Sequence, residues 1–454
     1  MRAEKSYWKI EMSKKIEEMI RELVGYSLEN RKKDWVPGTD WILYSGNYFD
    51  NREYESAIKC LLDGWLGLGE IGSRFERKFS SLMSHRYGIF VNSGSSANLL
   101  MVSALKSKRL SSLATGSKII TPAAGFPTTV NPILQNGFEP VFIDIEVDTL
   151  NMDLNQLEDA AKKGASALIF AHVLGNPPNM DDVMDISEKH GLIVLEDCCD
   201  ALGSKWKGRP LGSFGYMSSC SFYPAHHITT GEGGMVCCSH SAAEMVVRSL
   251  RDWGRGCYCS GKASACLKNG MCKKRYSAWI PEMPDVIMDH KYIYEEIGYN
   301  LKPMEMQAAI GMEQLAKLDS IIEARKRNFD LLMSVFSPYE SLFHIPQKSE
   351  HADVSWFAFP ITVKDGAGFS RTDLSVWLED HKIQTRNYFG GNMLLQPGYT
   401  QIRNVANPLD RFPVSTKVTR DTMFLGTSPV ISAEQIGYIE EVLKDFLNQI
   451  KKIK

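Results

Sequence analysis

The chain has 454 residues, 44% of them hydrophobic, and it carries 52 Lys+Arg against 54 Asp+Glu. This near balance of charge excludes a long-range field that would favour nucleic acid or an anionic membrane as a partner. No apolar run reaches the roughly 18 residues of a membrane span, and the charged amino terminus lacks the apolar core of a signal peptide. We therefore expect a cytoplasmic protein with one large and one smaller domain.

Residues 1–45 are predicted to form a helical extension. Further along, short apolar strands alternate with segments of helical length; the strand signals are "SKIITPA", "PVFIDI", "SALIFAHV" and "GLIVLEDC". This alternation is typical of a mostly parallel sheet covered by helices, so the predicted fold class is α/β. We place the large domain at residues 46–320.

The remainder of the chain predicts a smaller C-terminal α+β domain over residues 321–454. Residues 304–336 are expected to form one long amphipathic helix, because apolar residues recur there at three-to-four spacing. The strand signal "WFAFPITV", a helix near "TDLSVWLEDHK" and a terminal helix from about Ser432 to Ile450 follow it.

The turn "NSGSSAN", residues 92–98, stands between a strand and a helical segment. Glycine and hydroxyl residues at a helix amino terminus present backbone N–H groups and side-chain donors to an anion. A phosphate site is therefore one interpretation of this turn. An ordinary helix cap explains it equally well.

Glu196-Asp197 ends the apolar strand "GLIVLEDC". Ligands of open α/β sheets bind beyond that edge, and a carboxylate there can keep a pyridine nitrogen protonated, which makes the ring an electron sink. The alternative is a solvated aspartate that caps the next helix.

These features, together with "SFYPAHHITTGEGG" (residues 221–234), resemble fold-type-I pyridoxal-phosphate enzymes, and most closely the sugar aminotransferase group that acts on nucleotide-linked keto-sugars. The resemblance implies roles for six residues around the cofactor: Gly94, Ser95 and Ser221 at the phosphate, Phe126 stacked on the ring, Asp197 at the ring nitrogen and Asp200 near the ring hydroxyl. Most aminotransferases of the group have glutamine at that last position. Asn300, in "GYNLKPMEMQAAIG", would reach the phosphate of the neighbouring subunit, which implies a homodimer.

His226 stands where that group has its cofactor lysine, and His227 follows it. Imidazole does not form a stable imine, so covalent anchoring of the cofactor is lost, but it can still move a proton. Such a site should favour pyridoxamine phosphate (PMP), with His226 as the base in a dehydration. A decayed site is the alternative.

Nine of the ten cysteines divide into two sets, and Cys199 is taken up below. Five fit small buried hydrophobic residues: Cys60, Cys198, Cys220, Cys237 and Cys238. The run Cys257-Tyr258-Cys259, followed by Cys266 and Cys272, lies in a polar loop where packing does not explain it. Zinc is one alternative, although zinc pairs usually have C-x₂₋₄-C spacing; a metal-free loop is another.

Stretches from about Trp65 onward resemble the iron–sulfur, PMP-dependent CDP-4-keto-6-deoxyglucose-3-dehydrase family; they include "EDCCDALGSKWKGRPLGSFG", "RDWGRGCYC" and "RNYFGGNMLLQPGY". The resemblance implies a [2Fe–2S] cluster whose ligands are Cys199, beside the strand-end aspartate, and three cysteines of a loop at residues 252–276. Two of these three are Cys257 and Cys259. For the last one, the family spacing points to Cys266, whereas the flanking "CKKRY" signature matches Cys272, which we favour.

By this resemblance the protein is a 3-dehydrase of a nucleotide-linked 4-keto-6-deoxyhexose in 3,6-dideoxysugar synthesis of the lipopolysaccharide O-antigen type. It would work with an NAD(P)H-dependent flavin or iron–sulfur reductase, and Arg386, Phe389 and Asn392 are candidates for substrate contact. One alternative is a cluster-free dehydratase that uses glutamate as co-substrate. Another is a non-catalytic cofactor-binding regulator, and an ordinary aminotransferase is the least favoured.

Overall fold

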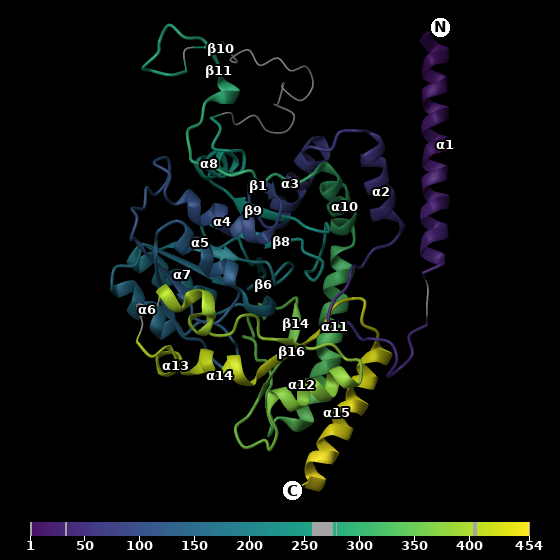
Figure 1. Ribbon diagram of the computed structural model, residues 1–454, viewed down its shortest axis with the longest axis vertical. Coiled ribbons are helices and arrows are strands. Elements are labelled where there is room, and N and C mark those ends of the chain that lie inside the picture. Colours follow the sequence, from purple (N-terminus) through teal and green to yellow (C-terminus); the bar gives the residue numbers. More distant parts are fainter. Residues whose placement is uncertain (1, 32–33, 257–275, 278, 403–405, 454) are drawn as a thin grey trace.

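The computed structural model describes residues 2–31, 34–256, 276–277, 279–402 and 406–453. Its centre is a seven-stranded sheet with strand order β1-β9-β8-β5-β4-β2-β3 (Figure 1). The strands are β1 (Tyr87–Val91), β2 (Lys118–Pro122), β3 (Glu139–Ile143), β4 (Ala167–Ala171), β5 (Ile193–Asp197), β8 (Met217–Ser221) and β9 (Gly234–Cys238). The four strand signals of the sequence correspond to β2, β3, β4 and β5, so that prediction is confirmed.

The sheet is mostly parallel, as predicted, and β9 runs antiparallel to both of its neighbours. Its strands are almost wholly buried because alternate side chains enter two different cores. Ile119 and Ile169, for example, pack into one apolar cluster, whereas Ile120 and Phe170 pack into another. Parallel strands end at one edge, so β5 and β8 place Asp197 and Ser221 at the same side of the sheet.

Helices cover both faces of this sheet (Figure 1). In the large domain they are α2 (Asn51–Leu62), α3 (Glu70–Leu82), α4 (Gly94–Ala104), α5 (Pro127–Gln135), α6 (Leu154–Lys162), α7 (Met180–His190), α8 (Ser241–Arg251) and α10 (Glu305–Ala316), with the 3₁₀ turns η1 (Val173–Gly175) and η3 (His290–Tyr292). Side-chain caps begin several of them; Ser93, for example, caps α4 and Asp153 caps α6. None of the described helices has the length and apolarity needed to cross a membrane.

The smaller C-terminal part is built on an antiparallel sheet of order β12-β14-β16-β15. Its elements are β12 (Phe343–His344), β14 (Ala358–Val363), β15 (Arg386–Asn387), β16 (Thr422–Gly426), α11 (Leu318–Phe336), α12 (Arg371–Asp380), α13 (Pro408–Arg411), α14 (Pro413–Asp421), α15 (Ala433–Ile453), η4 (Ser337–Tyr339), η5 (Met393–Leu395) and η6 (Pro397–Ile402). The predicted strand, the helix after it and the terminal helix are confirmed. A short sheet of β6 (Lys205–Trp206), β7 (Arg209–Pro210) and β13 (Ala352–Asp353) joins this part to the large one.

The expected single helix over residues 304–336 is two helices, α10 and α11, separated at Lys317. The backbone there has φ −105° and ψ 0°, and Lys317 is only 8% exposed. Its ammonium reaches the Tyr48 carbonyl at 3.0 Å and the buried Glu53 carboxylate at 2.5 Å. We attribute the break to these long-range partners, which the local periodicity does not contain.

Among the described residues of the predicted helical extension over residues 1–45, helix is confined to α1 (Arg2–Glu29), which runs beside α2 (Figure 1). Residues 34–45 instead pack on the small domain: Ile42 exchanges backbone hydrogen bonds with Lys382 and Gln384, of 2.7 and 2.9 Å. Pro37 and Gly38, with φ +71° at Gly38, favour a turn over a helix here. The amino-terminal segment is therefore part of the folded core.

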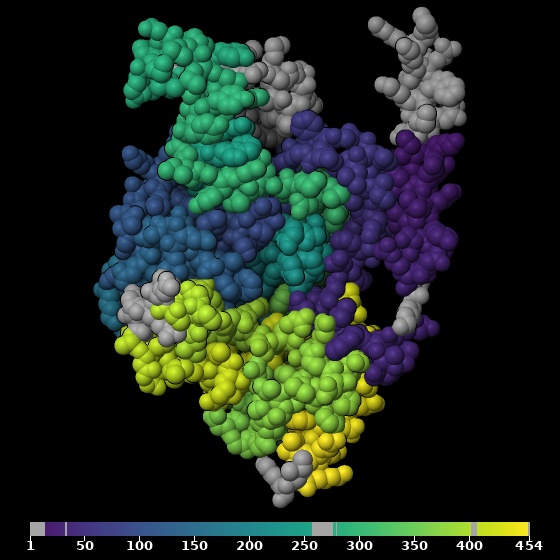
Figure 2. All heavy atoms as spheres, viewed as in Figure 1, coloured from purple at the N-terminus to yellow at the C-terminus, as the bar shows by residue number. Residues whose placement is uncertain are grey.

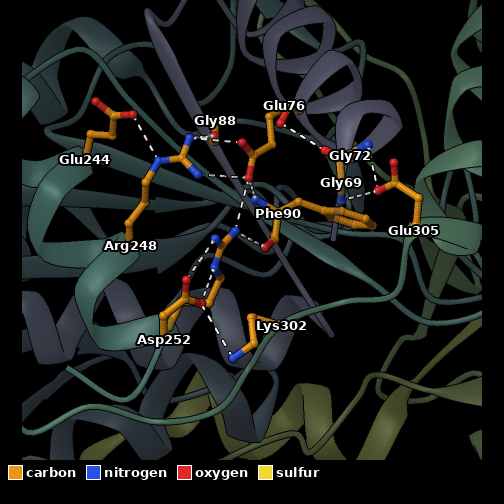
Figure 3. A network of polar contacts seen from close by, with 12 residues as sticks. Gly69, Gly72, Glu76, Gly88, Phe90, Glu244, Arg248, Asp252, Lys302 and Glu305 are labelled. Atoms are coloured by element: carbon orange, nitrogen blue, oxygen red, sulfur yellow. Dashed lines mark hydrogen bonds and ion pairs between the residues drawn. The ribbon is translucent and has the colours of Figure 1, made fainter. Parts of the chain in front are cut away.

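A network of buried charges fixes the end of α8 to the sheet (Figure 3). The Glu76 carboxylate accepts hydrogen bonds from Arg248 at 2.9 Å, from Arg251 at 3.1 Å and from the Phe90 backbone at 2.9 Å. Arg251 also binds Asp252, the first residue of the predicted iron–sulfur loop. Beyond it, the segment with β10 (Tyr276–Ser277) and β11 (Met288–Asp289) projects from the large domain (Figure 2).

Candidate active site

One pocket of about 670 Å³ lies at the carboxyl edge of the sheet, between the two domains. It brings together ten of the residues singled out in the sequence: Gly94, Ser95, Phe126, Asp197, Cys199, Asp200, Ser221, His226, Arg386 and Phe389. Residues separated by almost 300 positions thus form one site.

The amino terminus of α4 forms one corner of this pocket. Ser93 caps the helix by accepting the Ser96 N–H at 3.0 Å, so the turn is a helix cap, and the helix begins at Gly94. The Ser95 hydroxyl lies 3.1 Å from that of Thr128. A Cβ on Gly94 would meet the Ser221 Cβ at 2.5 Å, so only glycine fits there without a shift. Backbone N–H groups and hydroxyls with this arrangement suit a phosphate.

Asp197 is held in the pocket wall by three donors, and the Ser219 hydroxyl, whose shorter bond of 2.6 Å goes to Asn98 Oδ1, lies within reach of it. Its Oδ2 accepts from Asn98 Nδ2 at 2.7 Å and Thr129 Oγ1 at 2.8 Å. Its Oδ1 accepts from the Cys199 N–H at 3.1 Å and lies 3.4 Å from the Ser219 hydroxyl. The carboxylate is 5% exposed and has no freedom to turn away, so it can hold a cationic N–H of a bound ring.

The two histidines have different surroundings, and only His226 lines the pocket. Its Nδ1 lies 3.4 Å from Asp200 Oδ1 and has no hydrogen-bond partner among the described residues. His227 turns its Nε2 to the Ser355 carbonyl at 3.0 Å. The described lining contains no lysine. His226 is therefore the imidazole available to a ligand.

Burial and, second, the charge of Arg325 lower the pKa of His226 to about 4. The imidazole is consequently neutral at physiological pH and can accept a proton. Burial and the charge of Asp197 raise the pKa of the Asp200 carboxyl to about 8. Asp200 therefore keeps its proton in a large share of molecules at neutral pH and can donate a hydrogen bond.

Sequence reasoning missed Arg325, which supports this wall from α11. The guanidinium is 1% exposed, and among the described residues it binds carbonyl oxygens but no carboxylate. Its acceptors include the Phe357 carbonyl at 2.9 Å, the His226 carbonyl at 3.2 Å and the Ala225 carbonyl at 3.3 Å. It joins the histidine loop to the small domain. In "IEARKRNF" it stands beside the half-buried Lys326 and the exposed Arg327, and only its place on the apolar face of the helix could have signalled its burial.

The rim of the pocket carries Arg386 and Phe389, two of the predicted substrate residues, together with Tyr44 from the amino-terminal segment. The Arg386 guanidinium lies 4.3 Å from the centre of the Tyr44 ring and binds the Thr385 carbonyl at 2.7 Å, which leaves donors free. Phe126 is 49% exposed at the opening, and its ring meets that of Phe389 edge-on at 6.0 Å.

Asn392 was predicted to contact the substrate, but the structure places it away from the pocket. It is fully buried outside the pocket lining, its amide N–H groups bind Pro408 and Thr416, and its oxygen caps η5 at Leu394. Its side chain turns inward because it completes the turn that follows Phe389. A structural role therefore replaces the predicted one.

Asn300 also lies outside this pocket. It is exposed and accepts a hydrogen bond from Lys302 at 2.8 Å. Its reach to a partner subunit stays a prediction.

The five cysteines predicted to be buried are buried, so that interpretation is confirmed. Cys199 differs from them, because it is half-buried and is the cysteine that lines the pocket among those the structure describes. Cys257, Cys259, Cys266 and Cys272 lie outside the described residues.

Comparison with known proteins identifies the family. The profile of the DegT/DnrJ/EryC1/StrS aminotransferase family matches residues 47–444. The chain belongs to this family. Its fold is the α/β fold of pyridoxal-phosphate-dependent sugar aminotransferases, as the sequence predicted.

Similar proteins include a lipopolysaccharide biosynthesis protein and enzymes that are named sugar 3-dehydratases. The chain is 39% identical to the lipopolysaccharide biosynthesis protein RfbH of Salmonella typhimurium, over 91% of this chain and 93% of that protein. It is 38% identical to the dTDP-4-dehydro-2,6-dideoxy-D-glucose 3-dehydratase of Saccharopolyspora spinosa, over 93% and 90% of the two chains. The solved E. coli GDP-4-keto-6-deoxy-D-mannose-3-dehydratase with bound hydrated PLP superposes with a TM-score of 0.74, at 27% identity over 88% of this chain and 98% of that one.

Proposed function

We propose that the protein is a PMP-dependent 3-dehydratase of a nucleotide-linked 4-keto-6-deoxyhexose. The observation that carries the proposal is His226, which lines the pocket beside the phosphate-binding corner where an aminotransferase needs lysine. The names of the relatives support the same reaction and substrate class. An aminotransferase role is disfavoured because the described lining offers no amine for an imine.

The pocket fits the cofactor residue by residue. Gly94, Ser95 and Ser221 would hold its phosphate, and Asp197 its ring nitrogen. Phe126 would cover the ring, and Asp200 would lie near the ring hydroxyl. When bound, PMP supplies an amine for the keto-sugar and an electron sink for loss of the neighbouring hydroxyl.

His226 is the proposed base. Its neutral imidazole would take a proton from the PMP methylene carbon, and Asp200 Oδ1 lies 3.4 Å from its Nδ1. Arg386 and Phe389 would contact the substrate, with Arg386 suited to a phosphate of the nucleotide.

We further propose a [2Fe–2S] cluster held by Cys199, Cys257, Cys259 and Cys272, with Cys266 as the alternative fourth ligand. Cys199 supports it, since its thiol lies close to Gly94 in the pocket wall, where a one-electron centre could serve the sugar adduct. Burial and the charge of Asp197 raise the pKa of this thiol, so cluster assembly must release its proton. The electrons would come from a separate NAD(P)H-dependent flavin or iron–sulfur reductase, and a homodimer would bring Asn300 to the partner's phosphate. The setting would be 3,6-dideoxysugar synthesis for lipopolysaccharide O-antigen.

An absorption spectrum of anaerobically purified protein, with iron and acid-labile sulfide measured on the same sample, tests the cluster. CDP-, dTDP- and GDP-linked 4-keto-6-deoxyhexoses are then offered with PMP and a reductase. Dithionite-bleached visible bands, two irons per chain and loss of the C3 hydroxyl support the whole proposal. Iron-free protein that dehydrates a sugar with glutamate would favour the cluster-free enzyme.

Cys199→Ser is expected to lower the iron content by about half or more, because serine is a poorer ligand for iron–sulfur clusters than thiolate. Iron per chain is measured after identical anaerobic reconstitution. Cys60→Ala, in a buried cysteine of α2, is the control and should keep wild-type iron. Full iron in Cys199→Ser would remove Cys199 from the ligand set.

Gly94→Ala is expected to weaken binding of pyridoxal phosphate and PMP about tenfold or more. The new methyl group would meet Ser221 at 2.5 Å and Cys199 Sγ at 2.9 Å and would displace the phosphate corner. Fluorescence titration of the apoprotein measures the affinity. Gly437→Ala, in α15 with open space around its Cβ, is the matched helical control. Equal affinities for both variants would contradict the phosphate site at Gly94.

A further inference from the structure

The amino-terminal segment supplies part of the pocket wall, although the sequence assigned no site residue to it. The Tyr44 N–H donates a hydrogen bond to Gln384 Oε1 at 3.3 Å. The Ser45 hydroxyl donates to the Ala225 carbonyl at 3.0 Å. A Cβ on Gly426 would collide with the Tyr44 carbonyl, so the segment lies directly against the end of β16. These contacts fix Tyr44 to the small domain and to the histidine loop together.

The ring of Tyr44 is a fixed surface at the rim of the pocket. It packs against the apolar cluster under the rim and meets the Phe424 ring edge-on, with 6.3 Å between the ring centres. The central carbon of the Arg386 guanidinium lies 4.3 Å from the centre of the Tyr44 ring. An aromatic face attracts a cation at this distance through its quadrupole. The arginine therefore packs on a surface that does not move with it.

Arg386 is the cation that this ring supports. Among the described residues that line the pocket, it is the only lysine or arginine, and its side chain is exposed. Its contacts with the described residues are the Tyr44 ring and a hydrogen bond of 2.7 Å to the Thr385 carbonyl, and neither partner is charged. Packing on a ring uses the face of a guanidinium and leaves N–H donors at its edge free. Those donors suit a phosphate.

A long arginine side chain loses rotamer freedom when it binds a ligand, and this loss lowers the affinity. The ring and the carbonyl already restrict Arg386 in the free protein. We infer that Tyr44 is a positioning residue, whose ring holds the Arg386 guanidinium ready to bind a phosphate of the nucleotide. This inference rests on the proposed function. Tyr44 acts through Arg386 and touches no reacting atom in this role.

A double-mutant cycle of Tyr44→Leu and Arg386→Gln tests whether the ring acts through the guanidinium. Calorimetry measures the affinities of CDP, dTDP and GDP for the PMP-loaded protein, and the tightest of the three is used. Tyr44→Leu alone should weaken it about 3- to 30-fold, the range of a cation–π contact. In the Arg386→Gln background the same change should have an effect of no more than about twofold. With a nucleotide-keto-sugar that is converted, KM should rise and kcat should stay unchanged.

Trp41→Leu is the matched control. Trp41 belongs to the same segment and packs against the Lys382 ammonium at 5.1 Å, outside the pocket lining. This variant should keep the wild-type nucleotide affinity. Tyr44→Phe should also keep it, because phenylalanine retains the ring. PMP affinity should be the same in all these variants.

Several outcomes overturn the inference and leave the proposed reaction standing. One is wild-type affinity in Tyr44→Leu or in Arg386→Gln. Another is an undiminished effect of Tyr44→Leu in the Arg386→Gln background, because Tyr44 would then contact the nucleotide directly. An equal loss in Trp41→Leu, or a loss of PMP affinity in Tyr44→Leu, would show that the ring serves the fold. If the wild type binds none of the three nucleotides, the proposed substrate class fails first and the inference fails with it.

Discussion

Replacing His226 by asparagine is expected to slow exchange of the PMP methylene proton with solvent by at least about 10²-fold, the usual contribution of a positioned general base. PMP should remain bound, because the phosphate corner and Asp197 do not use the imidazole. Proton NMR or mass spectrometry of PMP recovered from deuterium oxide measures the exchange without any sugar substrate.

The adjacent histidine supplies the control for this experiment. His227→Asn changes a more deeply buried side chain whose ring faces Ser355 and does not line the pocket. We expect exchange within a few-fold of wild type in that variant. If exchange survives in His226→Asn, or if both variants lose it equally, the base assigned here is wrong.

The pH dependence of the exchange follows from the pKa of His226, which lies near 4 in the folded chain. Asp200, Asp197, Arg325 and His227 are the charged or titratable groups that act on this imidazole. Exchange should be nearly constant from about pH 7, below the pKa of Asp200, to about pH 5 and fall as the pH approaches 4. Between the unfolded value of 6.5 and 4 the unfolded chain binds the proton first, so this group makes the fold less stable as the pH drops.

The sequence was informative wherever the evidence was local. The buried strands β2 to β5, the glycine–serine turn at α4 and the aspartate at the end of β5 follow from patterns of a few residues, and the edge rule for parallel strands brings them together. The position of His226 in the site was predicted from its alignment with the cofactor lysine of the aminotransferase group. These residues do meet in one pocket.

The features that were missed depend on contacts between distant segments. Arg325 is buried because carbonyls of two loops converge on it, and Tyr44 reaches the pocket because its segment is held by residues 180 and 340 positions away. Asn392 was assigned to the substrate because of its place in a motif, but the direction of its side chain depends on the turn that it completes. The helix break at Lys317 was also missed, because it depends on contacts with the distant residues Tyr48 and Glu53.

Glu76→Gln is expected to lower the free energy of unfolding by about 3–5 kcal/mol, the usual effect of breaking a buried ion pair. Although burial acts to raise it, the charges of Arg248 and Arg251 keep the pKa of Glu76 below its usual value, so the folded protein holds a carboxylate there (Figure 3). Glutamine keeps the shape but removes the buried charge that both guanidinium groups share, which leaves Arg248 with Glu244 and Arg251 with the partly exposed Asp252. Urea unfolding followed by circular dichroism measures the loss.

Glu244→Gln is the matched control, because Glu244 binds the same Arg248 from the more exposed side of the network. Pairs of that kind contribute up to about 1 kcal/mol, so this variant should lose little stability. Equal losses in both variants would contradict a special role for burial. Arg251 also holds Asp252 at the start of the predicted iron–sulfur loop, so the same charge that stabilises the sheet anchors that loop. Glu76→Gln should therefore also lower iron retention, whereas Glu244→Gln should not.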